Sequence, residues 1–142
     1  MNPPRKAAPR RKAVFLAAAR ADVKRLHGDD EALAVLALTK IRELERGSIA
    51  GVPLAEMAAT GDLTDCRKVY FGPGNPPSHR IVYRDLGPAE GIEILEIVAV
   101  EAREELYAYL LAAVRLGRLP VESEPNFTRV HQEQITRRTR RR

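Results

Sequence analysis

The sequence predicts an α+β domain, with an N-terminal helical hairpin packed on a small curved antiparallel sheet and a helix at the C-terminal end. Three observations predict this fold. Apolar residues recur every three or four positions between residues 14 and 44, β-rich stretches occupy residues 66–100, and helical spacing returns after residue 101. The chain has 142 residues, 44% of them hydrophobic, which suffices for the core of one domain.

The predicted hairpin consists of two amphipathic helices. The first spans Val14–Leu26, where the apolar residues line one helical face. The second begins after a capping residue, Asp29 or Asp30, and ends at Gly47, which can adopt the left-handed conformation typical of helix C-termini. We therefore expect two short helices that pack against each other.

Three β-rich segments follow, and each is separated from the next by turn residues. Cys66–Phe71 and His79–Arg84 flank the turn sequence GPGNPPS, and Ile92–Val100 follows a turn at residues 87–91. Short connections of this kind join antiparallel neighbours. The sequence therefore predicts a three-stranded meander and leaves room for a fourth short strand.

The last regular element and the chain ends differ sharply in composition. Helical spacing over Glu101–Gly117 predicts a third helix, with Glu104 and Glu105 near its positive end. Residues 119–142 are polar and end in TRRTRRR, and residues 1–12 combine prolines with clustered cations. We predict a folded domain at 13–118 between two basic, poorly ordered ends.

Charge is distributed unevenly, although the net charge is +5. Residues 1–12 and residues 129–142 each carry +5, which leaves −5 for residues 13–128. An acidic body argues against a uniformly basic nucleic-acid-binding domain, because phosphate affinity grows with the number of cations along the backbone. Contact with RNA is therefore expected to be local or assisted by the tails.

The cysteine content and the hydropathy predict a cytoplasmic location. A single cysteine, Cys66, cannot form an internal disulfide, which fits a reducing compartment. No window approaches the roughly 20 apolar residues that a membrane span needs. The three histidines are scattered and form no metal-binding pattern, so neither a metal nor a cofactor is predicted.

Three sequence blocks resemble toxins of the RelE/ParE superfamily, and most closely its RelE branch of ribosome-dependent messenger RNA endonucleases. The resemblance covers roughly Val14–Gly117. Its most specific parts are DCRKVYF at residues 65–71, HRIVYR at 79–84 and ILEIVAVEAREELYAYL at 94–110, which occur in the family's order. It implies a toxin of a type II toxin–antitoxin system that acts on messenger RNA on the ribosome and is neutralised by a separate antitoxin protein.

The resemblance also implies site residues. Lys68, Arg80, Arg103 and Tyr109 stand at the positions of the family's catalytic residues, and Tyr70 stands where RelE itself has a second lysine. The candidate substrate-binding residues are Arg67, Arg84 and His79.

The implied chemistry is attack of a ribose 2′-hydroxyl on the neighbouring phosphate, with no metal. Lys68 and Arg80 would stabilise the developing negative charge, and Arg103 would assist protonation or charge neutralisation. Tyr109 would orient or stack on a base. Tyr70 could replace the missing lysine as the base if Arg67 and Arg80 lowered its pKa.

Several alternatives stay open from the sequence. Arg67, Arg84 and Arg103 could instead pair with acidic neighbours, namely Asp65, Asp85 or Glu104. A ParE-like member of the same superfamily would bind and poison DNA gyrase. A non-catalytic module would contact nucleic acid through the arginine-rich C-terminal segment.

Overall fold

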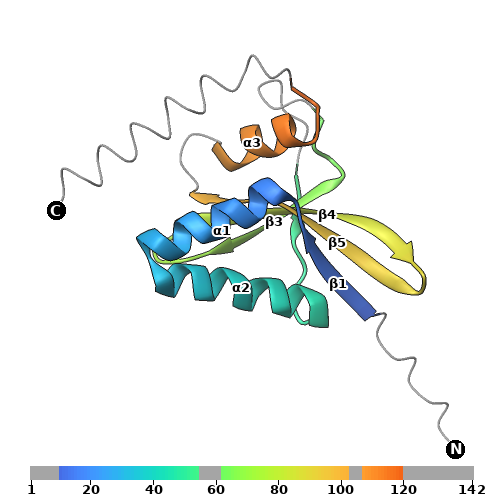
Figure 1. The fold of residues 1–142 in the computed structure, drawn as a ribbon, viewed down its shortest axis with the longest axis horizontal. Helices are drawn as coiled ribbons and strands as arrows, with labels where there is room; N and C mark the ends of the chain where they lie inside the picture. Colours follow the sequence, from blue (N-terminus) through green and yellow to red (C-terminus); the bar gives the residue numbers. More distant parts are fainter. Residues whose placement is uncertain (1–9, 55–61, 103–106, 120–142) are drawn as a thin grey trace, which may run out of the picture.

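The computed structural model describes residues 10–54, 62–102 and 107–119. The elements follow one another in the order β1 (Arg10–Phe15), α1 (Ala17–Asp29), α2 (Glu31–Arg46), β2 (Val52–Pro53), β3 (Cys66–Phe71), β4 (His79–Ala89), β5 (Ile92–Ala102) and α3 (Tyr107–Arg115). Figure 1 shows α3 and α2 on opposite sides of the sheet. The α+β class is as predicted.

One five-stranded sheet forms the middle layer, with the strand order β1-β5-β4-β3-β2. The predicted meander is confirmed, because β3 pairs antiparallel with β4 and β4 pairs antiparallel with β5. The predicted fourth short strand is β2, which pairs antiparallel with β3. The prediction of a wholly antiparallel sheet is wrong, since β1 pairs parallel with β5 and makes the sheet mixed.

The prediction was also wrong at the start of the chain, where a strand precedes the helices. The sequence predicts Val14 and Phe15 in the first helix, but they lie in β1. It predicts Arg10–Lys12 in a flexible arm, but they belong to the same strand. The burial of β1 alternates along the strand, and its backbone finds partners on β5. Pairing with a strand more than 75 residues away therefore overrides the local helical spacing.

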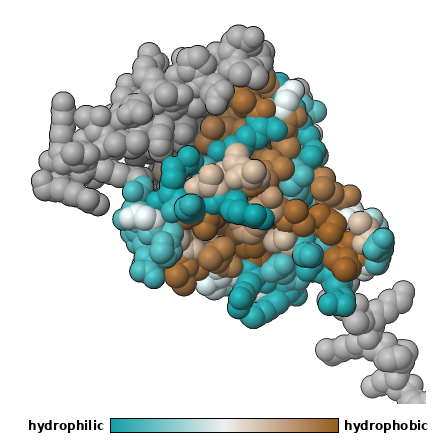
Figure 2. All heavy atoms as spheres, viewed as in Figure 1, coloured by the Kyte–Doolittle hydropathy of each residue, from teal (hydrophilic) through white to brown (hydrophobic). Residues whose placement is uncertain are grey.

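The two helices that follow β1 cover one face of the sheet. Asp30 caps α2, its side chain accepting a hydrogen bond from Leu33 N at 3.2 Å, and Gly47 ends α2 with φ of 74°. Their inner faces join residues of β3, β4 and β5 in one apolar cluster, which includes Ala37, Ile41 and the fully buried Ile97. The space-filling view shows apolar surface interrupted by polar side chains (Figure 2).

The opposite face is covered by α3. Its buried residues Ala108, Tyr109 and Ala112 pack with strand residues such as Cys66 and Val82 in a second apolar cluster. The predicted third helix began at Glu101, but Glu101 and Ala102 continue β5. Residues 103–106 lie outside the described residues, and so do 1–9 and 120–142, to which the predicted tails largely belong. No helix in the described ranges is long and apolar enough to cross a membrane.

Candidate functional site

Four of the five predicted catalytic residues lie together on the face that α3 covers. Lys68 and Tyr70 are two residues apart on β3, so their side chains project from the same face of the sheet. Arg80 of β4 is directly opposite Tyr70 in the strand register. Tyr109 reaches the same place from α3. We call Lys68, Tyr70, Arg80 and Tyr109 the cation–phenol cluster.

Both cations of the cluster lie over both phenol rings. The Arg80 guanidinium carbon is 4.6 Å from the centroid of the Tyr109 ring and 5.0 Å from that of Tyr70. Lys68 Nζ is 5.2 Å from the Tyr70 centroid and 5.7 Å from the Tyr109 centroid. The rings therefore hold two positive charges close together through cation–π attraction.

No carboxylate of the described residues neutralises these two cations. The ion pairs in the described ranges involve other arginines and lysines, and none of them includes Lys68 or Arg80. Arg80 Nε is buried and has no hydrogen-bond partner among the described residues. A buried guanidinium donor in this state favours an anionic ligand, because leaving it unsatisfied costs free energy.

The cluster also changes the acidity of its own phenol. A hydrogen bond with Lys68 lowers the pKa of Tyr70, and the charges of Lys68 and Arg80 and a hydrogen bond with Tyr109 lower it further, against the opposing effect of burial. The sequence hypothesis attributed this effect to Arg67 and Arg80. Lys68 replaces Arg67 in that role, because Arg67 projects from the other face of β3.

Two of the predicted substrate-binding residues face α1 and α2 instead of the cluster. Arg67 Nη1 donates to Gly51 O at 2.9 Å. His79 is buried, its ring lies 5.3 Å from that of Phe71, and its Nδ1 is 2.7 Å from Ser78 Oγ. These contacts belong to the packing of the helical face and do not bring either side chain to Arg80.

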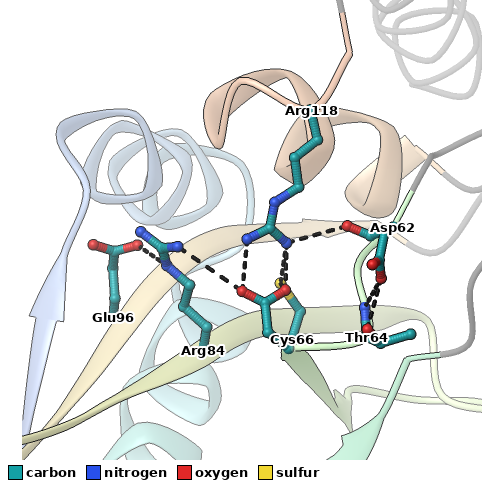
Figure 3. Close-up of polar contacts among 7 residues, drawn as sticks. Asp62, Thr64, Cys66, Arg84, Glu96 and Arg118 are labelled. Carbon is teal, nitrogen blue, oxygen red and sulfur yellow. Dashed lines mark hydrogen bonds and ion pairs between the residues drawn. The ribbon is translucent and has the colours of Figure 1, made fainter.

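The third predicted substrate-binding residue, Arg84, shares the face of the cluster but belongs to an ion-pair network. Its Nε lies 2.7 Å from Glu96 Oε1 and its Nη1 lies 3.9 Å from Asp65 Oδ2. The two carboxylate oxygens of Asp65 also accept hydrogen bonds from the two terminal guanidinium nitrogens of Arg118. Figure 3 shows Arg84 between Glu96 and the side chain that Arg118 contacts. The alternative of acidic pairing is therefore confirmed for Arg84, and Asp65, Arg84, Glu96 and Arg118 form the paired-arginine network.

Two further sequence expectations concern Arg103 and a metal site. Arg103 lies outside the described residues. Within residues 10–54, 62–102 and 107–119, no three His, Cys, Asp or Glu side chains are grouped so that they could hold a metal ion.

Sequence reasoning missed a buried charged pair beside β5. Asp22 of α1 is 2% exposed and contacts Arg115 of α3. The available signal is weak, since Asp22 stands among Arg20, Lys24 and Arg25, and an acidic residue in such a charged segment more often faces solvent.

Comparisons with known proteins give one structural likeness. No family model matches the chain, and no curated protein matches it. The structure is similar to that of a YoeB/ParE toxin from Agrobacterium tumefaciens, with a TM-score of 0.50 and 22% sequence identity. The likeness covers 65% of this chain and 98% of the toxin, so nearly the whole toxin fold has a counterpart here.

Proposed function

Starting from the fold of a RelE/ParE-type toxin, which this chain has, we propose that the protein is the toxin of a toxin–antitoxin pair and cleaves messenger RNA on the ribosome. The fold admits more than one target, so the site must decide between them. The observation that carries the proposal is the cation–phenol cluster, in which two cations without a carboxylate partner among the described residues surround a phenol of lowered pKa.

The cluster is suited to a phosphodiester. Arg80 offers a buried Nε–H donor together with a planar guanidinium, and Lys68 adds a compact charge nearby. Such donors stabilise the negative charge that develops on the phosphate oxygens during attack. The two basic ends of the sequence would add non-specific attraction to RNA.

The reaction we propose breaks one bond and forms one at phosphorus. The ribose 2′-oxygen attacks the adjacent phosphate as its proton passes to the Tyr70 phenolate, and the bond to the 5′-oxygen of the next nucleotide breaks. The products are a 2′,3′-cyclic phosphate and a 5′-hydroxyl, whose oxygen takes up a proton. We assign that proton to Arg103 or to solvent, and we assign stacking on a base to Tyr109.

A separate antitoxin protein is the partner that this proposal requires. Toxins of this fold are expected to be held inactive by a partner segment that covers the active face. Co-expression should then allow growth of cells that expression of the toxin alone arrests.

The test is to map new messenger RNA 5′ ends in translating cells after induction of wild type, Arg80→Ala and Arg84→Ala. Wild type should create 5′-hydroxyl ends inside translated codons, and Arg80→Ala should reduce them by about 10²-fold or more. Arg84→Ala is the matched control, because it removes an arginine from the same strand face that already has carboxylate partners. Equal losses in the two variants would contradict the assignment of the site.

A second candidate function is gyrase inhibition, which the ParE part of the similar toxin's name favours. Growth arrest without new RNA ends, accompanied by DNA breaks, would support it. The third alternative, a binding module that acts through the C-terminal segment, predicts that deletion of residues 121–142 abolishes both nucleic-acid binding and growth arrest.

A further inference from the structure

A buried ion pair joins α1 to α3 beside the last strand of the meander. Asp22 Oδ2 lies 2.6 Å from Arg115 Nη1, and Asp22 Oδ1 lies 2.9 Å from Arg115 Nη2. The Asp22 side chain is fully buried and that of Arg115 is 14% exposed. Two parallel bonds between a carboxylate and a guanidinium fix orientation as well as distance.

The pair also completes the open edge of β5. β1 pairs with β5 only as far as Phe15 opposite Ile97, so no strand of the described residues pairs with the backbone of β5 on this side beyond that point. Asp22 Oδ2 accepts a hydrogen bond from Val100 N at 3.0 Å, and Arg115 Nη1 donates to Val98 O at 2.9 Å. The sheet edge thus ties both members of the pair to a fixed place.

This anchor lies on the helix that carries Tyr109. Arg115 is the last residue of α3, and Tyr109 precedes it by six residues, about 9 Å along the axis. The 5% exposed Tyr109 ring contacts Lys68 and Arg80. Rotation or sliding of α3 about its anchored end would move this ring relative to the guanidinium group of Arg80.

We propose that Asp22 is a positioning residue, whose paired bonds to Arg115 hold α3 so that the Tyr109 ring stays over Arg80. The effect on RNA cleavage rests on the proposed function. The placement of the ring does not, so it can be measured separately.

Two neighbouring contacts provide matched controls. Arg25 pairs with the same Asp22 carboxylate and with Glu101, but it belongs to α1 and forms no ion pair with the described residues of α3. Arg118 follows α3 and pairs with Asp65 at the surface. If any loss of charge near α3 displaced Tyr109, then Arg25→Met and Arg118→Met would act like the loss of Asp22.

The experiment compares wild type with Asp22→Asn, Arg115→Lys, Arg25→Met and Arg118→Met, all in the full chain. Asparagine keeps an acceptor for Val100 N but lacks the charge, and lysine keeps the charge but lacks the fork. Ring placement is read from the Nε–Hε NMR resonance of Arg80, which the two rings shift. The pKa of Tyr70, which the Tyr109 hydrogen bond helps to lower, is read by ¹³C NMR titration.

In Asp22→Asn and Arg115→Lys, we expect the Arg80 resonance to move towards its unshifted position and the pKa of Tyr70 to rise. Cleavage should slow about tenfold or more in kcat, because small displacements of a reacting geometry cost that much. Both controls should keep the wild-type resonance and pKa.

An unchanged Arg80 resonance and Tyr70 pKa in a folded Asp22→Asn or Arg115→Lys protein would overturn the inference, as would equal changes in Arg25→Met. Should Asp22→Asn fail to fold, Arg115→Lys decides alone. A wild-type protein that cleaves no RNA would refute the proposed function and would leave the NMR result to decide the role of Asp22.

Discussion

The arginines at the two ends of one sheet face have opposite surroundings. At one end Arg84 lies between Glu96 and Asp65, and Asp65 is shared with Arg118. At the other end Arg80, four residues earlier on β4, has aromatic rings as neighbours and no carboxylate partner among the described residues. Arginine side chains are present at both ends, but only the second presents uncompensated positive charge.

The difference extends to acid groups on β3. Hydrogen bonding with Lys68 and the nearby cations lower the pKa of Tyr70 in the cation–phenol cluster. Four residues away, burial and the charge of Asp65 raise the pKa of Cys66 to about 11, although Arg118 is nearby. The positions of the carboxylates therefore determine which end of the face stabilises an anion. The presence of cations is not sufficient.

The largest expected effect comes from placing a carboxylate beside Arg80. Lys68→Glu would give Arg80 a partner, and we expect cleavage to fall by about 10²–10³-fold and the pKa of Tyr70 to rise. Arg67→Glu makes the same charge change one residue earlier, on the opposite face, and should leave cleavage within a few-fold. Single-turnover cleavage and a Tyr70 titration check both statements. Loss of activity in Arg67→Glu but not in Lys68→Glu would contradict the placement of the site on the face of Lys68.

A smaller loss is expected from Tyr70→Phe, which keeps the ring and removes the hydroxyl. We expect a loss of about 10²-fold, the lower end of what removal of a general base costs. Because only the phenolate accepts a proton, the wild-type rate should rise with pH until it passes the lowered pKa of Tyr70, and this rise should vanish in the variant. The pH–rate profiles of the two proteins provide the measurement. Identical profiles would remove Tyr70 from the reaction.

Much of the fold followed from local patterns, and the errors have physical causes. Asp30 caps the start of α2 and Gly47 caps its end, as expected, because capping depends on neighbouring residues. The strand at Arg10–Phe15 was missed because only its distant partner β5 makes it a strand. When the residues of a segment fit both helical and strand spacing, pairing with a distant strand determines which structure forms. The sequence of that one segment does not show this pairing.

The candidate site shows the same limit. The alternation of β3 places Lys68 and Tyr70 together, and the resemblance supplied Arg80 and Tyr109. The sequence could not distinguish Arg84 from Arg80, because both lie on one strand face and only the positions of Glu96 and Asp65 separate them. It also could not show that Asp22 is buried, since that depends on where α3 packs.

A moderate effect of pH on stability is expected from Glu101, which lies opposite Arg80 on β5. Burial raises the pKa of Glu101 to about 8, and the nearby Asp22 adds to this. The folded protein then holds a proton that the unfolded chain loses above roughly pH 4.5, so the free energy of unfolding should fall between about pH 5 and 8, by at most about 1.4 kcal/mol per pH unit. Urea unfolding at several pH values measures this, and Glu101→Gln should flatten the dependence. A wild-type stability that rises over this range would contradict the assignment.

The smallest effect is expected at the paired end. Arg84→Gln should lower the free energy of unfolding by about 1 kcal/mol or less, because its ion pairs are partly exposed, and should leave cleavage unchanged. Thermal or urea unfolding gives the first value, and the cleavage assay gives the second. A strong loss of cleavage at full stability would show that this end also contacts the substrate.

The most direct test of the central claim is an NMR titration of the full chain with a dinucleotide whose attacking 2′-hydroxyl is replaced by hydrogen, at low salt, with the arginine Nε–Hε resonances as the readout. If the cation–phenol cluster is the phosphate site, the Arg80 resonance should shift in proportion to binding, while that of Arg84, held by Glu96, should stay in place. Binding that moves Arg84 or other arginines and leaves Arg80 unchanged would contradict the account.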